Sequence, residues 1–211
     1  MKNVYELAGC HRGADIWIVA AGPTMDYVGQ DFFDGKISIG VNQVYRKYRT
    51  TWLVRKEGAL FDEARESGIP LIASRYDCGS YQMGLNPPGD YVFDHLENEH
   101  TRVDLNVIDK KSDKIVVSYS TITSAIHIAA VMGAKNIILC GHDCGTLDGK
   151  FRMDGYSEEM VGGEGFYRRW LGEILPQTLA VRQKIRVVFG CRMYSLNPFL
   201  GLTMEGHTVG N

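Results

Sequence analysis

Short runs of apolar residues alternate with turn-forming residues along the first half of the chain. The run at 16–20 ends at Gly22-Pro23, and similar runs of four or five residues recur downstream. Short apolar runs bounded by glycine, proline or polar residues are typical of buried strands. We therefore predict strands over residues 16–20, 37–41, 51–54 and 70–73.

Helical patterns lie between and after these runs. Residues 59–66 show one such pattern, and residues 121–132 are apolar on nearly every face, which predicts a helix buried on several sides. From residue 166 onward, apolar side chains recur every four positions, which predicts a further helix. Pro176 should kink or restart that helix. Two more apolar runs predict strands over residues 136–140 and 185–189.

The alternation of strands with helices predicts an α/β fold of the Rossmann-like class, with a mostly parallel sheet and helices on both faces. A length of 211 residues fits a single domain over 1–211. Segment 76–114 departs from the pattern, because a proline- and glycine-rich piece at 84–89 precedes a polar run, with one short strand at 91–93. We predict that segment 76–114 is an insertion or a lid.

Ligands of parallel α/β sheets bind beyond the carboxyl ends of the strands, so we expect the chemistry in the loops that follow them. After the first strand, Gly22 lets a ligand approach the backbone, Pro23 follows, and Thr24 can cap a turn whose N–H groups face an anion. The alternative is a plain strand-to-helix turn, because the Walker pattern and the dinucleotide glycine fingerprint are absent. After the second strand, Asn42 can bind a base or ribose, or it can cap the next helix.

Hydroxyl side chains open the apolar helix at 121–132. Thr123 and Ser124 lie in its first turn, where side-chain donors and the helix dipole can bind a phosphate. Ordinary helix capping is the alternative interpretation. A basic stretch with aromatic residues, 45–49, directly follows Asn42 and could also contact an anionic ligand, although such a run is usually a solvated surface.

The loop after the most apolar strand carries a second group of candidates. Gly141, His142 and Asp143 follow that strand directly. Asp143 can hold Mg²⁺ or accept a hydrogen bond from a ribose hydroxyl, and His142 can serve as an acid or base near neutral pH. Zinc is a weaker interpretation, since Cys140 and Cys144 lack a second pair of ligands. No organic cofactor is expected.

Composition narrows the classes of function. There are 23 basic and 25 acidic side chains, giving a net charge of −2, so we expect no general affinity for nucleic acids or anionic membranes. No apolar run approaches the roughly 18 residues that a membrane span requires. Five cysteines, an odd number, do not form a secreted disulfide framework, and Arg12 and Asp15 interrupt any signal peptide. These features predict a cytoplasmic protein.

Several short motifs, taken in order, resemble those of a known family. They are Ala21-Gly22-Pro23-Thr24-Met25, Ile39-Gly40-Val41-Asn42, Ser124-Ala125, and the stretch from Met132-Gly133-Ala134 to Gly141-His142-Asp143. The chain is similar in these motifs to the domain of the archaeal 6-hydroxymethylpterin diphosphokinase, of the MptE-like type. That domain is shared with the Maf-type motility-associated flagellin glycosyltransferases. A more distant resemblance is to the bacterial sialyltransferases of glycosyltransferase family 42.

The resemblance implies a nucleotide held across the first two strand ends. By position it implies that Gly22, Pro23, Thr24 and Asn42 contact the nucleotide. It also implies that Thr123 and Ser124 lie near the phosphate, and that Gly141 and Asp143 occupy a later strand end. Three positions depart from the sialyltransferases: Ala21 replaces an asparagine, Thr121 an arginine and Gly145 a tyrosine. No counterpart of their catalytic histidine occurs in residues 155–175, so these departures argue against sialyl transfer by the mechanism of that family. The Ala-Gly-Pro and Gly-His-Asp forms resemble more closely the diphosphokinase and flagellin-transferase branch.

These observations predict a nucleotide-dependent transferase. The leading version transfers a sugar from a nucleotide-sugar donor of the CMP-sugar type to an unidentified acceptor, with Asp143 and His142 as catalytic residues. One alternative transfers diphosphate from ATP to 6-hydroxymethyl-dihydropterin, which requires Mg²⁺ between the phosphates. A third interpretation is a nucleotide-binding module without catalysis.

Overall fold

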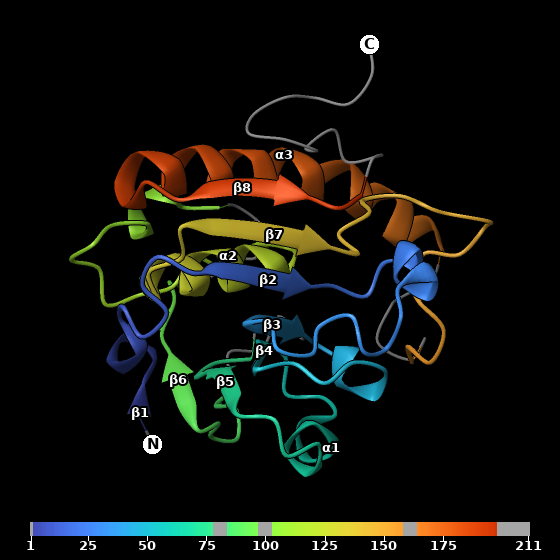
Figure 1. Cartoon of the computed structure of the whole chain (residues 1–211), viewed down its shortest axis with the longest axis horizontal. Helices are drawn as coiled ribbons and strands as arrows, with labels where there is room; N and C mark the ends of the chain where they lie inside the picture. The colour runs from blue at the N-terminus through green and yellow to red at the C-terminus, as the bar shows by residue number, and fades with distance from the viewer. Residues whose placement is uncertain (1, 78–83, 97–102, 158–163, 198–211) are drawn as a thin grey trace.

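In the part of the chain that the structure describes, eight strands pair in parallel in one sheet (Figure 1). The structure is a computed structural model and describes residues 2–77, 84–96, 103–157 and 164–197, with side chains from 172 onward in the last range. The sheet order is β1-β6-β5-β4-β3-β2-β7-β8. The strands are β1 Lys2–Asn3, β2 Asp15–Val19, β3 Ser38–Val41, β4 Trp52–Arg55, β5 Leu71–Ser74, β6 Tyr91–Phe93, β7 Asn136–Cys140 and β8 Arg192–Ser195.

The order in which strands are added to the sheet reverses at β2, which has five described strands on one side and two on the other. From β2 the chain adds strands on one side as far as β6, and it then crosses over to place β7 on the other side of β2. In parallel α/β sheets the loops that follow the strands at such a reversal diverge, and a ligand can enter between them. The loops after β2 and β7 therefore define where the candidate site lies.

Helices cover both faces of the sheet, which confirms the predicted fold class. The α-helices are α1 Phe61–Glu66, α2 Thr121–Val131 and α3 Glu164–Phe189, and the 3-10 helices are η1 Val4–Leu7, η2 Pro23–Tyr27, η3 Val44–Arg46 and η4 Leu105–Val107. Helices α2 and α3 pack together on one face. The other face is covered by α1 and by the segments around η2 and η3.

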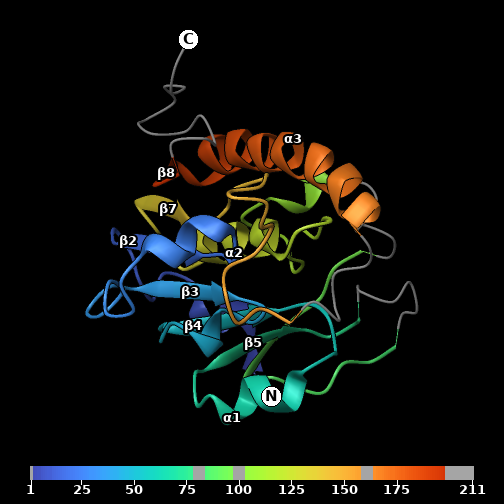
Figure 2. The same ribbon diagram turned by 90° about the vertical axis from the view of Figure 1, so that its right-hand side faces the viewer.

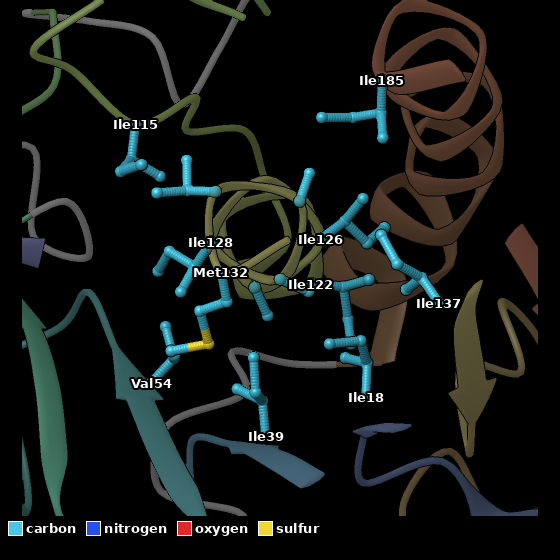
Figure 3. Packing of buried hydrophobic residues seen from close by; sticks show 14 of the residues in the cluster. Ile18, Ile39, Val54, Ile115, Ile122, Ile126, Ile128, Met132, Ile137 and Ile185 are labelled. Carbon is cyan, nitrogen blue, oxygen red and sulfur yellow. The ribbon is translucent and has the colours of Figure 1, made fainter. Parts of the chain in front are cut away.

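The core is formed mainly where α2 lies on the sheet. All eleven residues of α2 are buried, as the apolar sequence of this helix predicted. Figure 3 shows Ile122, Ile126 and Ile128 of α2 surrounded by side chains of the strands, of α3 and of the segments at the two ends of α2. The labelled partners are Ile18, Ile39, Val54, Ile137, Ile115, Met132 and Ile185. Burial on this scale fixes the start of α2 against the ends of β3 and β4.

The predicted strand over 185–189 is wrong, because these residues form the last turns of α3. Buried positions recur at helical spacing along α3, at Ile174, Thr178, Val181 and Ile185, whereas Val187 is 77% exposed. A strand would instead have placed Ile185 and Val187 on the same face. The final strand is β8, which follows a left-handed glycine at Gly190.

Two further predictions concern Pro176 and segment 76–114. Helix α3 runs through Pro176 without a break, so the predicted restart is wrong. Segment 76–114 includes residues 78–83 and 97–102, which lie outside the described residues. Its described part contributes β6 to the sheet and Val107 and Ile108 to the core, while a role as a lid stays a prediction. No described helix is both long and apolar enough to span a membrane.

Candidate functional site

The candidate site lies at the carboxyl edge of the sheet, which faces the viewer in Figure 2. The loops after β2, β3, β4 and β7 and the start of α2 come together there. The loop after β7 crosses in front of the ends of β3 and β4 (Figure 2). Hydrogen bonds hold it in this position: the Ser157 amide donates to Oε1 of Gln43 at 2.8 Å, and the Asp154 amide donates to Oδ1 of Asp26 at 2.9 Å.

The loops after β2 and β7 are joined through Asp143. Oδ2 of Asp143 accepts from the Thr24 amide at 2.8 Å, and Oδ1 accepts from the Thr24 hydroxyl at 2.6 Å. Oδ1 also accepts from Nδ2 of Asn197, just beyond β8, at 2.5 Å. The structure therefore brings the predicted residues Thr24 and Asp143 together, and it adds Asn197. A single carboxylate connects the loops that follow β2, β7 and β8.

The two predicted glycines permit this close approach. The Gly22 amide donates to the Gly141 carbonyl at 2.8 Å. A Cβ atom at Gly22 would lie 2.4 Å from both Oδ2 of Asp143 and the Gly141 carbonyl oxygen. Gly141 has a φ of +67°, and a Cβ there would meet Met25 at 2.3 Å. Both glycines are thus required by the packing of one loop on another, and their contact with a nucleotide stays a prediction, as does that of Pro23.

The carboxylate of Asp143 is used in hydrogen bonds within the protein, and its binding of Mg²⁺ stays a prediction. Mg²⁺ takes oxygen ligands in octahedral geometry, usually from one or two carboxylates together with water or substrate. The carboxylate of Asp143 already accepts three hydrogen bonds from N–H and O–H donors. Among the residues that the structure describes, no group of three or more His, Cys, Asp or Glu side chains is arranged to hold a metal ion, by Asp143 or elsewhere.

His142 belongs to the loop after β7, and its side chain is buried against α3. Its Nε2 is 2.8 Å from the Thr178 hydroxyl of α3 and 3.5 Å from the sulfur of Cys144. Burial, together with the charge of Arg152, lowers the pKa of His142 to about 4. Burial and the neighbouring Asp143 raise the pKa of Cys144 to about 12. At neutral pH the imidazole is therefore uncharged and the thiol is protonated.

Asn42 lies at the carboxyl end of β3 in an unusual backbone conformation. Its φ is +56°, in the left-handed region that few residues other than glycine adopt, although asparagine tolerates it. Oδ1 of Asn42 accepts from the Thr121 hydroxyl at the start of α2 at 3.1 Å. The Asn42 side chain also lies near Tyr156 in the loop after β7, where it opposes the rise in the pKa of Tyr156. The Asn42 side chain thus lies among three separate segments at the sheet edge.

The hydroxyls predicted to bind phosphate are used within the protein. The Thr123 hydroxyl donates to the Ser120 carbonyl at 2.9 Å and lies 2.8 Å from the Ser118 hydroxyl. The Ser124 hydroxyl donates to the Val116 carbonyl at 2.8 Å, and both side chains are buried. Ser120 is the N-cap of α2. Thr121, rather than Thr123 or Ser124, is the hydroxyl residue in contact with Asn42.

Sequence reasoning missed a group of charged residues at the end of β4. Arg55 is fully buried and Lys56 is 2% exposed. The Lys56 ammonium donates to the Ser118 carbonyl at 2.5 Å and lies 3.7 Å from Glu57. A signal was present in the sequence, because these three charged residues directly follow the apolar run of β4, where a strand meets the carboxyl edge.

Arg152 and Tyr156 extend this charged group from the loop after β7. The Arg152 guanidinium lies over the Tyr156 ring, 5.0 Å from its centre. Burial raises the pKa of Tyr156, while the charges of Arg152 and Arg55 oppose this rise. Both guanidinium groups therefore lie close enough to Tyr156 for their charges to influence its pKa. By contrast, two cations of the predicted basic stretch 45–49 are paired: Arg46 binds Glu63 at 2.6 Å and Lys47 binds Asp26 at 2.9 Å.

Comparisons with known proteins give a similarity of fold. No protein-family model matches the sequence, and no curated protein matches it significantly. Among solved structures, the chain is similar to the sialyltransferase CstII from Campylobacter jejuni in complex with a substrate analogue, cytidine-5'-monophosphate. The sequence identity is 14%, the TM-score is 0.45, and the match covers 95% of this chain and 89% of that chain. A likeness of this degree assigns neither a ligand nor a residue role here.

Proposed function

We propose that this chain is a nucleotide-dependent transferase that takes a nucleotide-sugar of the CMP-sugar type as its donor, with Asn42 in contact with the nucleotide. The observation that carries the proposal is the placement of Asn42. It is held in the left-handed region at the carboxyl end of β3, between Thr121 and Tyr156. Residues other than glycine remain in the left-handed region where the surrounding structure holds them, and such residues are enriched at ligand sites.

The charges around Asn42 support an anionic ligand. Arg55, Lys56 and Arg152 carry positive charge near this edge, and Glu57 carries the negative charge that lies beside Lys56. A nucleotide brings phosphate charge that guanidinium groups bind well. The choice of a CMP-sugar rests on the resemblance of the Gly22-Pro23 loop and Asn42 to the family 42 sialyltransferases.

In the proposed reaction, these positive charges stabilise the leaving nucleotide. An acceptor hydroxyl attacks the anomeric carbon of the sugar, and the bond from that carbon to the phosphate oxygen breaks. The nucleotide leaves with the electron pair, and the hydroxyl proton passes to a base or to water. Cationic side chains held in place before the reaction stabilise the negative charge that develops on the phosphate.

Asp143 has a positioning role in this proposal. Through Thr24 and Asn197 its carboxylate fixes the loop that lies beside the proposed nucleotide. His142 joins the same loop to α3 through its hydrogen bond with Thr178.

Calorimetric titration of the full chain with CMP tests the proposal, with Asn42→Gly as the informative variant. Glycine adopts a φ of +56° without strain, so this change removes the amide and keeps the backbone. We expect CMP affinity to fall about fivefold to a hundredfold, which is the range for loss of a hydrogen bond or two. Asn106→Ala, at an exposed position in η4, is the matched control and should bind CMP normally.

Other nucleotides distinguish the alternatives. A thermal-shift panel of CMP, CTP, UDP, GDP and ATP, each with and without Mg²⁺, should favour CMP and be independent of Mg²⁺. A ligand at 100 times its dissociation constant stabilises a protein by about 2.7 kcal/mol, which is readily detected. A preference for ATP that depends on Mg²⁺ would favour the diphosphokinase instead. CMP binding without release of CMP from any CMP-sugar would favour a non-catalytic module.

A further inference from the structure

Arg55 ends β4 with its side chain fully buried. Nη2 donates to the Ala59 carbonyl, four residues further along the chain. Nε and Nη1 are also buried, and within the described part of the chain neither has a hydrogen-bond partner. Arginine is the most hydrophilic of the fully buried side chains, and most of the N–H donors of Arg55 are unused.

Such an arrangement is costly in free energy. A buried charge loses its hydration, and proteins normally offset this loss by pairing the charge and filling its hydrogen-bonding positions. Among the described residues, no carboxylate lies within ion-pair distance of Arg55. Glu63, which is close enough to be influenced by Arg55, accepts two hydrogen bonds from Arg46 at 2.6 Å. Glu63 is therefore bound to another cation, and Glu57 lies 3.7 Å from the Lys56 ammonium.

We propose that Arg55 binds a phosphate group of the ligand, in a subsite between the carboxyl end of β4 and the Arg152–Tyr156 segment. The loop that carries Arg152 and Tyr156 crosses in front of the end of β4 (Figure 2), and Tyr156 lies close enough to both Arg55 and Arg152 for their charges to influence its pKa. Asn42, Arg152 and Tyr156 are partly exposed, so solvent reaches the side chains that border the proposed subsite. Bound phosphate supplies acceptors for Nε and Nη1 of Arg55, and it supplies the missing negative charge.

This inference deepens the proposed function, since it names the residue that holds the phosphate of the nucleotide. It also predicts a property of the protein without ligand. If Arg55 is kept for a ligand, then Arg55→Met removes an uncompensated charge and should leave the free protein as stable as before, or more so. A purely structural arginine would give the opposite result.

Calorimetry with CMP and cytidine, which differ by one phosphate, tests the inference on the full chain. In Arg55→Met, we expect CMP affinity to fall about tenfold to a hundredfold, the range for a charged hydrogen bond, while cytidine affinity is unchanged. Arg55→Lys keeps the charge but loses the planar donors, and should give a smaller loss. Arg65→Met, an exposed arginine on α1, is the matched control and should change neither affinity.

Each other outcome is decisive. Unchanged CMP affinity in Arg55→Met would overturn the inference and leave the proposed function standing. Loss of stability, with CMP and cytidine weakened equally, would make Arg55 a structural residue and also overturn it. If Arg55→Met does not fold, Arg55→Lys decides by the same comparison of CMP with cytidine. If the wild-type protein binds no nucleotide, the proposed function fails, and titration with inorganic pyrophosphate then tests Arg55 alone. Pyrophosphate binding that the Arg55 variants lose would support the subsite. No pyrophosphate binding by the wild-type protein would overturn it.

Discussion

At the scale of single residues, Asp143 shows how one side chain can hold several loops of a site together. Its position after a central strand predicted a role with ligand or metal. The structure instead surrounds its carboxylate with donors from Thr24 and Asn197. Because both partners lie in loops that border the candidate site, a change at Asp143 should affect stability and ligand binding together.

Asp143→Asn should lower the free energy of unfolding by about 1–3 kcal/mol, because the new NH₂ group faces a donor that loses its acceptor. Urea denaturation measures this difference. Asp148→Asn is the control, since Asp148 is exposed and its φ of +51° suits asparagine. Unchanged stability in Asp143→Asn would show that these hydrogen bonds contribute little, and Asp143 would again be a candidate for direct contact with substrate.

At the scale of elements, α3 is where sequence and structure differ most. The segment 185–189 contains Ile, Val, Val and Phe, which favour strands when judged locally. Its tertiary setting favours a helix, because Val181 and Ile185 reach the core in register with the preceding turns. Local preference is overruled in this way when the buried stripe of a long helix continues through the segment.

A pair of substitutions tests this assignment. Ile185→Ala should destabilise the protein by about 2–5 kcal/mol, as is typical for a buried isoleucine. Val187→Ala should change stability by less than about 0.5 kcal/mol, because Val187 is 77% exposed. Thermal or urea denaturation of both variants gives the comparison. Similar large losses for both would favour a strand at 185–189, since alternate residues of a strand share a face.

Much of the remaining fold could be predicted from sequence. The apolar runs that became β2, β3, β4, β5 and β7 are short, bounded by turn residues and buried on both faces, so pattern and structure coincide. The site was harder to predict. Thr24 and Asp143 were named separately, but nothing local in sequence shows that they bond across 119 residues. Arg55 was missed because a charge beside a strand usually indicates solvent, whereas here it is buried.

At the scale of the whole molecule, stability should depend on pH, mainly through His127 and His142, the two buried histidines whose pKa is lowered most. His127 of α2 accepts from the Val116 amide through Nδ1, and burial lowers its pKa to about 4. The pKa of His142 is also lowered to about 4. A histidine whose pKa is lower in the folded state takes up its proton first in the unfolded state. The folded protein is therefore favoured above pH 6.5 and loses stability as the pH falls from 6.5 toward 4.

We expect the free energy of unfolding to fall between pH 6.5 and pH 5, by up to about 1.4 kcal/mol per pH unit for each histidine. Urea denaturation at pH 7.5, 6.5 and 5.5 measures the slope. His127→Gln, which keeps an acceptor but does not titrate, should reduce the slope by about the share of one histidine. If the slope is the same in this variant, His127 does not contribute to the pH dependence of the free energy of unfolding.

The strand order has a consequence for synthesis on the ribosome. β2 pairs with β3 and with β7, and Trp17 lies opposite both Ser38 and Ile138. The first partner is translated almost at once, whereas the second follows some 120 residues later, which at the usual speed of translation is roughly 6–25 s. During that interval the β7-facing edge of β2 has no partner in the nascent chain. A strand edge left open in this way is a template for association with other chains, so yield in cells should respond to chaperone supply and to slower translation.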